Sequence, residues 1–318
     1  MSSPVSDPVS WPAGVQEAAE VVSARPVGAY THLVLRAPEA ARRAQPGQFV
    51  ACGTGDSGML LRRSLSLHAA DPEAGTLEVV VAAAGPGTRL LAAKRPGDVV
   101  STTAPLGRPF PVPAPGTPAV VIGGGYGAAP LPWLARVLTA GGSRVVGIVG
   151  AASADRLLGT SAVDDATALD GIADAVVVTT DDGSLGAPGR VTDALPEVLL
   201  ELSELGEPAV YACGPMPMLR SVHTTTREVL GERAQTWLAV EESMACGVGV
   251  CMTCVLPVVD LDDDDTPTRM LRACTAGPVF DGDALRWDAI GAAPHLRDGA
   301  LVPDDAVGAP VVGRAGGH

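Results

Sequence analysis

Four cysteines near the C-terminal end of the chain constrain its fold and chemistry more than any other feature. Cys246, Cys251 and Cys254 form a C-x4-C-x2-C run, and Cys274 follows the third of them after a further 20 positions. This is the plant-type spacing of four thiolates that hold a [2Fe–2S] cluster. Two glycines inside the first gap allow positive φ, so a short loop can wrap the cluster. The spacing therefore predicts an electron carrier.

A zinc site is the alternative for these four thiols. Structural zinc sites usually pair two short C-x2-C hairpins, and this segment has only one. The two other cysteines, Cys52 and Cys213, lie far away in the sequence. In a reducing compartment six cysteines are better explained as metal ligands and buried thiols than as a disulfide framework.

Composition limits the classes of protein to which the chain can belong. Its 318 residues suffice for two or three domains, and a hydrophobic content of 47% with 18% charged residues fits a soluble globular protein. No apolar run is long enough to span a bilayer, and residues 1–15 lack the pattern of a secretory signal, so we expect no membrane partner and a cytoplasmic location. A net charge of −14 argues against a nucleic-acid partner.

The chain divides into three blocks between two predicted flexible tails, 1–15 and 291–318. The first block, 16–116, contains short apolar runs separated by turns, which predict a small antiparallel barrel. These runs are 20–23, 32–36, 48–52, 64–68, 77–82 and 98–102.

The second block, 117–235, alternates buried-strand runs with helical patterns, which favours a parallel sheet with βαβ connections. Its strand runs are 119–122, 144–150, 175–179 and 209–212. The third block, 236–290, is the cysteine segment, whose acidic stretch at 260–265 is expected to be a solvated turn. The predicted fold class is therefore multidomain, an antiparallel β-barrel followed by a parallel α/β domain and a small C-terminal [2Fe–2S] domain.

Two motifs in the first block could meet a phosphate group. Arg62 and Arg63, with Ser64 and Ser66, place two guanidinium groups and two hydroxyls at a strand start. Gly87 and Thr88 belong to a glycine turn before a helix start, where free N–H groups attract phosphate. A plain N-cap by Thr88 is the alternative for the second motif.

Two motifs in the second block suit a dinucleotide. Gly123, Gly124, Gly125 and Gly127 lie between a strand and a helix, where glycines let the backbone approach a pyrophosphate. The next strand has no acidic residue at its tip to bind a ribose hydroxyl, so the choice between NAD and NADP stays open. The second motif follows a later strand, where a thiol could face a nicotinamide or could simply be buried; it consists of Cys213, Gly214 and Pro215.

Taken in order, these motifs resemble the ferredoxin–NADP reductase superfamily and, within it, the electron-transfer subunits of class 1B dihydroorotate dehydrogenase. The resemblance covers residues 16 to 290. Residues 179–186 (TTDDGSLG), 241–246 (EESMAC) and 277–280 (GPVF) carry the closer likeness. The sequence departs from the family at Ser64, where proline is usual, and at Leu65, which offers no aromatic ring.

The resemblance implies three cofactors and their ligands. A [2Fe–2S] cluster would bind the four cysteines, and NAD, with NADP not excluded, would bind the glycine turn and the Cys213–Pro215 motif. FAD would lie against a set of barrel residues that comprises Arg63, Ser64, Leu65, Ser66, Val80, Val81, Ala82, Gly87 and Thr88.

The resemblance also implies a partner, an FMN-containing catalytic subunit that oxidises dihydroorotate. Electrons would pass from it through the cluster and FAD to NAD+ in pyrimidine biosynthesis, and any proton-abstracting residue would belong to that subunit. Two alternatives remain. One is a related NAD(P)H-dependent reductase subunit that serves ferredoxin, a hydrogenase or a sulfite reductase. The other is a non-enzymatic, zinc-stabilised interaction protein.

Overall fold

The computed structural model describes residues 14–290 except 57, 165–166, 232–233 and 260–267, together with the backbone of two short strands near the C-terminus. These strands, β16 (Leu296–Arg297) and β17 (Ala300–Leu301), pair within the predicted tail. The rest of that tail, the N-terminal tail before residue 14 and the acidic stretch at 260–265 lie outside the described residues. No helix in the described part is long and apolar enough to cross a membrane.

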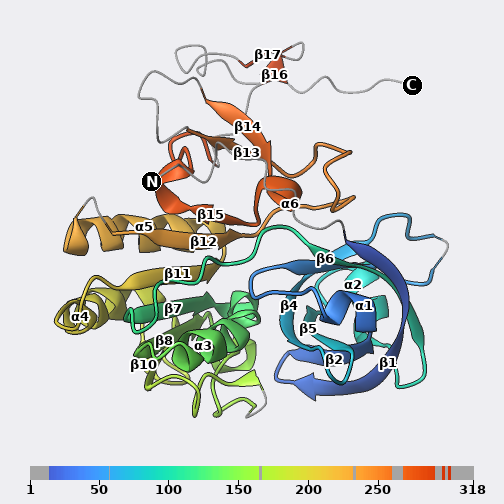
Figure 1. Cartoon of the computed structure of the whole chain (residues 1–318), viewed down its shortest axis with the longest axis horizontal. Coiled ribbons are helices and arrows are strands. Elements are labelled where there is room, and N and C mark those ends of the chain that lie inside the picture. The colour runs from blue at the N-terminus through green and yellow to red at the C-terminus, as the bar shows by residue number, and fades with distance from the viewer. Residues whose placement is uncertain are drawn as a thin grey trace.

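The N-terminal part is a closed antiparallel barrel with strand order β1-β2-β5-β4-β3-β6 (Figure 1). This confirms the predicted barrel. Its core forms from inward-pointing apolar side chains, such as Val21, Leu33, Val50 and Val79, that the strands present toward the barrel interior. Two short helices, α1 (Pro38–Ala41) and α2 (Pro86–Ala92), lie between strands. The strands are β1 (Val15–Val27), β2 (Tyr30–Arg36), β3 (Phe49–Cys52), β4 (Arg63–Asp71), β5 (Thr76–Ala82) and β6 (Val99–Leu106).

The second part is a seven-stranded sheet with order β10-β9-β8-β7-β11-β12-β15, and all its neighbours are parallel except β12 and β15. The predicted parallel sheet is thus confirmed. Its strands are β7 (Ala119–Gly124), β8 (Val145–Ala151), β9 (Ala175–Thr180), β10 (Ala187–Pro188), β11 (Ala209–Gly214), β12 (Thr236–Val240) and β15 (Val279–Asp281).

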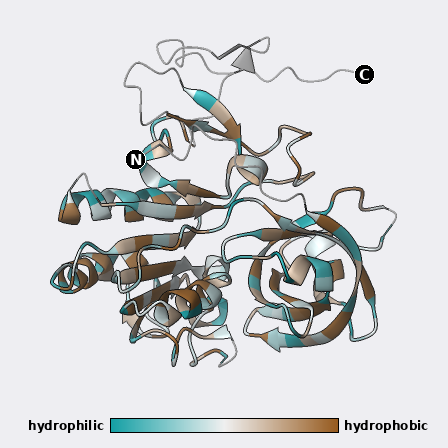
Figure 2. Ribbon diagram, in the orientation of Figure 1, coloured by the Kyte–Doolittle hydropathy of each residue, from teal (hydrophilic) through white to brown (hydrophobic). Residues whose placement is uncertain are grey.

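Helices cover both faces of this sheet, which explains why its strands are apolar almost without interruption. Val120 and Ile122 pack with helices α4 (Val191–Ser203) and α5 (Met216–Leu230). Val121 packs on the other face with α3 (Leu131–Ala140). Figure 2 shows hydrophobic residues along the central strands of the sheet and in stretches of the barrel strands.

The sheet extends beyond the boundary predicted at residue 235. Strand β12 adds in parallel to β11, and β15 adds to β12 as an antiparallel edge. Both strands fall in the block predicted to be a separate cluster domain. Strand β12 is almost fully buried, because the neighbouring strands and α5 cover its apolar side chains. Pairing with the sheet provides this cover, and β15 then covers the outer edge of β12. The remaining C-terminal part consists of a hairpin, β13 (Val255–Val258) with β14 (Arg269–Arg272), and helix α6 (Ala273–Ala276).

Candidate functional site

The cysteine segment forms a tight loop whose backbone donors point at sulfur. The N–H groups of Val248, Val250 and Cys251 donate to Cys246 Sγ over 3.3 to 3.5 Å. The loop can turn this sharply because Gly247 and the other loop glycine, Gly249, have φ of 72° and 78°. N–H groups aimed at thiolates are the hydrogen bonds that tune an iron–sulfur centre.

The four thiols form two pairs. The side chain of Cys246 interacts with that of Cys251, and the side chain of Cys274 with that of Cys254. Burial alone would raise the pKa of Cys246, but hydrogen bonds from Cys251 and Val248 outweigh it and lower that pKa to about 6. Burial and the neighbouring Cys254 raise the pKa of Cys274 to about 12. Cys246 also raises the pKa of Cys274, so the four thiols lie together, and the C-x4-C-x2-C spacing favours an iron–sulfur cluster over zinc.

A cavity of about 160 Å³ lies between this segment and the barrel. Ser64 and Ser66 on β4 line it, since alternate residues of a strand share one face. Leu65, which was predicted to pack on a flavin, instead lies in the barrel core with 4% of its surface exposed. That prediction is wrong for the Leu65 side chain because the same alternation turns it inward.

The predicted phosphate-binding residues meet beside α2. A Cβ atom on Gly87 would lie 2.3 Å from Arg63 Nε, so the guanidinium covers the backbone of the glycine turn. Arg63 has no carboxylate partner among the described residues, which leaves its charge available to a diphosphate. Thr88 Oγ1 accepts a hydrogen bond from Gly85 N and donates to Gly85 O. Its hydroxyl therefore closes the turn from the third position of α2, and Gly85, not Thr88 as in the alternative, is the N-cap.

The predicted flavin-facing strand has its residues on different faces. Val81 packs into the barrel core, whereas Val80 packs toward the α/β domain. Ala82 is partly exposed at the end of β5, opposite Tyr30. None of the three lines the cavity beside Ser64 and Ser66.

A larger cavity of about 570 Å³ opens at the carboxyl ends of the parallel strands. Gly124, Gly125, Gly127 and Pro215 line it, so the structure brings the two predicted nucleotide motifs together. Gly123 does not line it, because a Cβ there would lie 2.6 Å from the Ala128 side chain. This edge of the sheet is where open α/β sheets bind their ligands.

The two motifs touch directly. A Cβ on Gly127 would lie 2.4 Å from the carbonyl oxygen of Cys213, and one on Gly214 would lie 2.8 Å from Met218. Cys213 lines the smaller cavity and is 8% exposed. Burial and then the nearby Glu241 raise the pKa of its thiol to about 12, so it is protonated at neutral pH.

Three residues line both cavities, Tyr126, Gly127 and Glu241, so the two spaces adjoin. Among the described residues the buried Tyr126 hydroxyl has no hydrogen-bond partner, and neither has Thr179 Oγ1 in the larger cavity. Buried polar atoms of this kind are normally satisfied, and two beside cavities fit bound flavin and nicotinamide nucleotides.

Sequence reasoning missed several lining residues. Tyr126 lies within the glycine turn at 123–127, and Glu241 begins the segment 241–246. The spacing of residues in these motifs does not indicate a role for either side chain. Tyr30 comes from the barrel, where its hydroxyl donates to the Arg156 carbonyl oxygen over 2.6 Å. Arg156 and Arg190 also line the larger cavity.

Comparison with known proteins identifies the family. Residues 241–286, which contain all four cysteines, match the family model described as the iron–sulfur cluster binding domain of dihydroorotate dehydrogenase B. The dihydroorotate dehydrogenase B (NAD(+)) electron transfer subunit of Bacillus caldolyticus is 40% identical over 242 residues, covering 74% of this chain and 84% of the relative. The chain belongs to this family of electron transfer subunits.

Other members and a solved structure agree with this assignment. The dihydroorotate dehydrogenase B electron transfer subunit of Shouchella clausii is 36% identical over 259 residues, covering 78% of this chain and 89% of the relative. The solved structure of an NADH-dependent reduced ferredoxin–NADP oxidoreductase, studied for flavin-based electron bifurcation, has 27% identity and a TM-score of 0.70, covering 86% of this chain and 91% of that chain. The predicted family, fold class and type of flavin and iron–sulfur oxidoreductase subunit are therefore confirmed.

Proposed function

We propose that this chain accepts electrons from an FMN-containing, dihydroorotate-oxidising subunit and passes them through a [2Fe–2S] cluster and FAD to NAD+. The names of its relatives, which are NAD(+)-linked electron transfer subunits of dihydroorotate dehydrogenase B, support this function. An electron transfer subunit needs a catalytic partner. The proposal places the protein in the cytoplasm, in agreement with six free cysteines.

One observation carries the proposal, namely that three sites adjoin in order. The smaller cavity touches the cysteine segment at Met244, and it shares Tyr126 and Glu241 with the larger cavity. When bound, a flavin exchanges single electrons with an iron–sulfur centre and an electron pair, as hydride, with a nicotinamide. The order of the sites suits that exchange.

We assign roles to the chain's residues accordingly. Ser64 and Ser66 present hydroxyls to the flavin ring in the smaller cavity, and Arg63 holds the diphosphate over Gly87. Gly127 brings the backbone turn against Cys213 and leaves room for a nicotinamide beside it. Burial raises the pKa of Tyr126, so its hydroxyl stays protonated and can donate to a bound cofactor.

A related reductase subunit that couples NAD(P)H to ferredoxin is the second candidate. The likeness to the ferredoxin–NADP oxidoreductase over most of both chains favours it. The two functions share their cofactors, so only the partner separates them.

The test is to isolate the cofactor-loaded chain with its partner from the native cell and assay both. Alone, the chain should reduce an artificial dye with NADH but should not oxidise dihydroorotate. With the partner, dihydroorotate should reduce NAD+, and a Cys251→Ser chain should abolish this coupled reaction while the dye reaction persists. A partner that reacts with ferredoxin but not with dihydroorotate would contradict the proposal. A chain that binds no flavin would contradict both candidates.

A further inference from the structure

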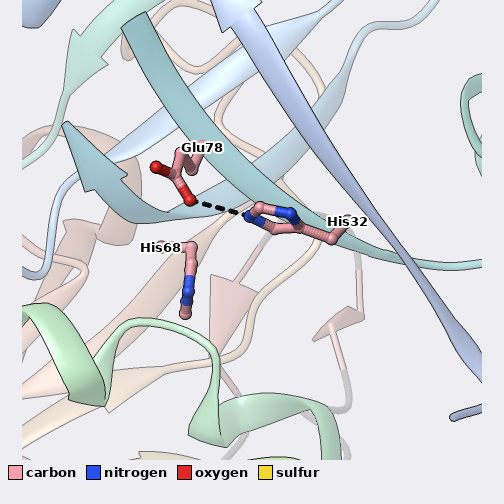
Figure 3. Close-up of side chains that lie close together, drawn as sticks. All are labelled: His32, His68 and Glu78. Atoms are coloured by element: carbon pink, nitrogen blue, oxygen red, sulfur yellow. Dashed lines mark hydrogen bonds and ion pairs between the residues drawn. The ribbon is translucent and has the colours of Figure 1, made fainter. Parts of the chain in front are cut away.

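Three side chains outside the electron-transfer site lie close together on the outer face of the barrel (Figure 3). They are His32 on β2, His68 on β4 and Glu78 on β5, and one ligand atom of each lies within 4.8 Å of the others. His32 is 4% and His68 1% exposed. The side chain of Glu78 is 30% exposed, which leaves a route from solvent.

The pairing of β4 with β5 is broken beside Glu78. Leu67 pairs with Val79 and Ala69 with Glu78, so His68 is the extra residue of a β-bulge. Bulges re-aim side chains and occur preferentially next to functional sites. Across the bulge His68 and Ala69 therefore both lie opposite Glu78.

A hydrogen bond fixes the orientation of the His68 ring. Its Nδ1 lies 2.5 Å from the carbonyl oxygen of Ala129, so Nδ1 carries the proton and donates. The lone pair is then on Nε2. Metal-binding histidines are typically held in this way, with one ring nitrogen donating to a backbone carbonyl and the other facing the ion.

His32 makes one hydrogen bond where a buried imidazole needs two. Its Nε2 lies 2.8 Å from Glu78 Oε2, while its buried Nδ1 has no hydrogen-bond partner among the described residues. The contact makes Nε2, and not Nδ1, the His32 nitrogen that lies beside the carboxylate.

We propose that His32, His68 and Glu78 bind one divalent transition-metal ion, with Zn²⁺ as the representative. Two imidazoles and one carboxylate suit zinc and similar borderline ions, whereas Mg²⁺ and Ca²⁺ prefer oxygen ligands throughout. Zinc bonds of about 2.1 Å in a tetrahedron set ligand atoms roughly 3.4 Å apart. His32 Nε2 and Glu78 Oε2, now 2.8 Å apart, must therefore separate slightly, and pairs of ligand atoms as far as 4.8 Å apart must move closer. The proton between His32 and Glu78 is released as the ion enters.

The ion would join two parts of the molecule. Three barrel strands supply the ligands, and Ala129, which orients His68, lies between the glycine turn and α3. The ion would thus stabilise the contact between the barrel and the α/β domain. It would be separate from the cysteine segment, to which none of the three ligands belongs.

The test uses the full chain with its flavin and iron–sulfur cluster in place. Crystals equilibrated with micromolar Zn²⁺ should show an anomalous peak at the zinc edge between the three side chains, which distinguishes this site from zinc bound by cysteines. Glu78→Gln, which keeps the side-chain shape, should weaken zinc binding about tenfold or more in equilibrium dialysis. The exposed barrel variant Glu20→Gln is the matched control and should bind zinc as the unaltered chain does.

Two results would overturn the proposal. One is the absence of an anomalous peak at these side chains in cluster-loaded crystals, which would leave His32 and Glu78 as a hydrogen-bonded pair. The other is equal zinc binding by the unaltered chain and Glu78→Gln. If Glu78→Gln fails to fold, the anomalous map of the unaltered chain decides alone.

Discussion

Ser64 Oγ donates a hydrogen bond to the carbonyl oxygen of Met244 over 3.1 Å, across 180 positions of sequence. Ser64 lies on barrel strand β4 and lines the smaller cavity, while Met244 precedes the first cluster cysteine by two residues. The bond therefore ties the proposed flavin-binding strand to the cysteine segment. Electron transfer between neighbouring centres depends on such fixed spacing.

Removing this bond should loosen the cysteine segment. Ser64→Ala should lower stability by about 1 kcal/mol, because the Met244 carbonyl loses its donor, and should speed loss of the cluster to an iron chelator. The decay of the visible cluster absorption measures that rate. Ser66 lies on the same face of β4 but makes no hydrogen bond to the described part of the segment, so the rate for Ser66→Ala should match that of the unaltered chain. Equal rates in all three proteins would show that the bond does not hold the segment.

The glycine turn should tolerate no side chain at Gly127. In Gly127→Ala the new Cβ would lie 2.4 Å from the Cys213 carbonyl oxygen, so the turn must move away. We expect NADH to bind about tenfold or more weakly, roughly 1.4 kcal/mol, as measured by titration. Gly53→Ala is the matched control, since its Cβ would meet only ordinary contacts at 3.4 Å or more. Unchanged NADH affinity in Gly127→Ala would place the nicotinamide elsewhere.

Substitution of a predicted cluster cysteine should remove the cluster, whereas substitution of Cys52 should not. Cys251→Ser should remove the visible absorption of the cluster but retain flavin, because Cys251 lies on the exposed loop and does not line the smaller cavity. Cys52→Ala, deep in the barrel core, should keep both the iron and the flavin. Iron analysis and absorption spectra provide the measurement. A Cys251→Ser protein with a full complement of iron would exclude Cys251 as a ligand.

The contact between α5 and the C-terminal part should weaken in acid. Burial lowers the pKa of His223 below its ordinary 6.5; Asp283 opposes this shift and Arg227 adds to it. The folded protein then holds a neutral imidazole where the unfolded chain takes up a proton. The contribution to stability is fully present above pH 6.5 and is lost as the pH falls below it toward the lower folded-state pKa.

His223→Asn isolates this contribution, because asparagine keeps a polar atom near the Nδ1 that bonds Thr236. The melting temperature should fall less in the variant than in the unaltered chain between about pH 7.5 and about pH 5.5. The difference between the two decreases in melting temperature excludes the effect of other titrating groups, which both proteins share. Parallel curves for the two proteins would show that His223 titrates alike in the folded and unfolded states.

Much of the fold could be predicted because the sequence patterns that indicate its strands each lie within a short stretch of chain. The six barrel strands and the central parallel strands follow from alternating or continuous apolar runs. The assignment failed at β12 and β15, whose apolar residues stand close to the cysteines in sequence but pair with the sheet. It also failed for the Leu65 side chain, whose direction depends on the register of β4 in the closed barrel.

The sequence by itself determined the cluster motif, because four thiols at fixed spacing and the glycines between them act within a short stretch of chain. It also determined the glycine turn that approaches Cys213. Only the tertiary structure decided that Glu241 and Tyr126 line both cavities, that Ser64 bonds Met244 and that two histidines meet Glu78. These contacts arise when the barrel closes and packs on the sheet, and no local pattern encodes which distant side chains that packing brings together.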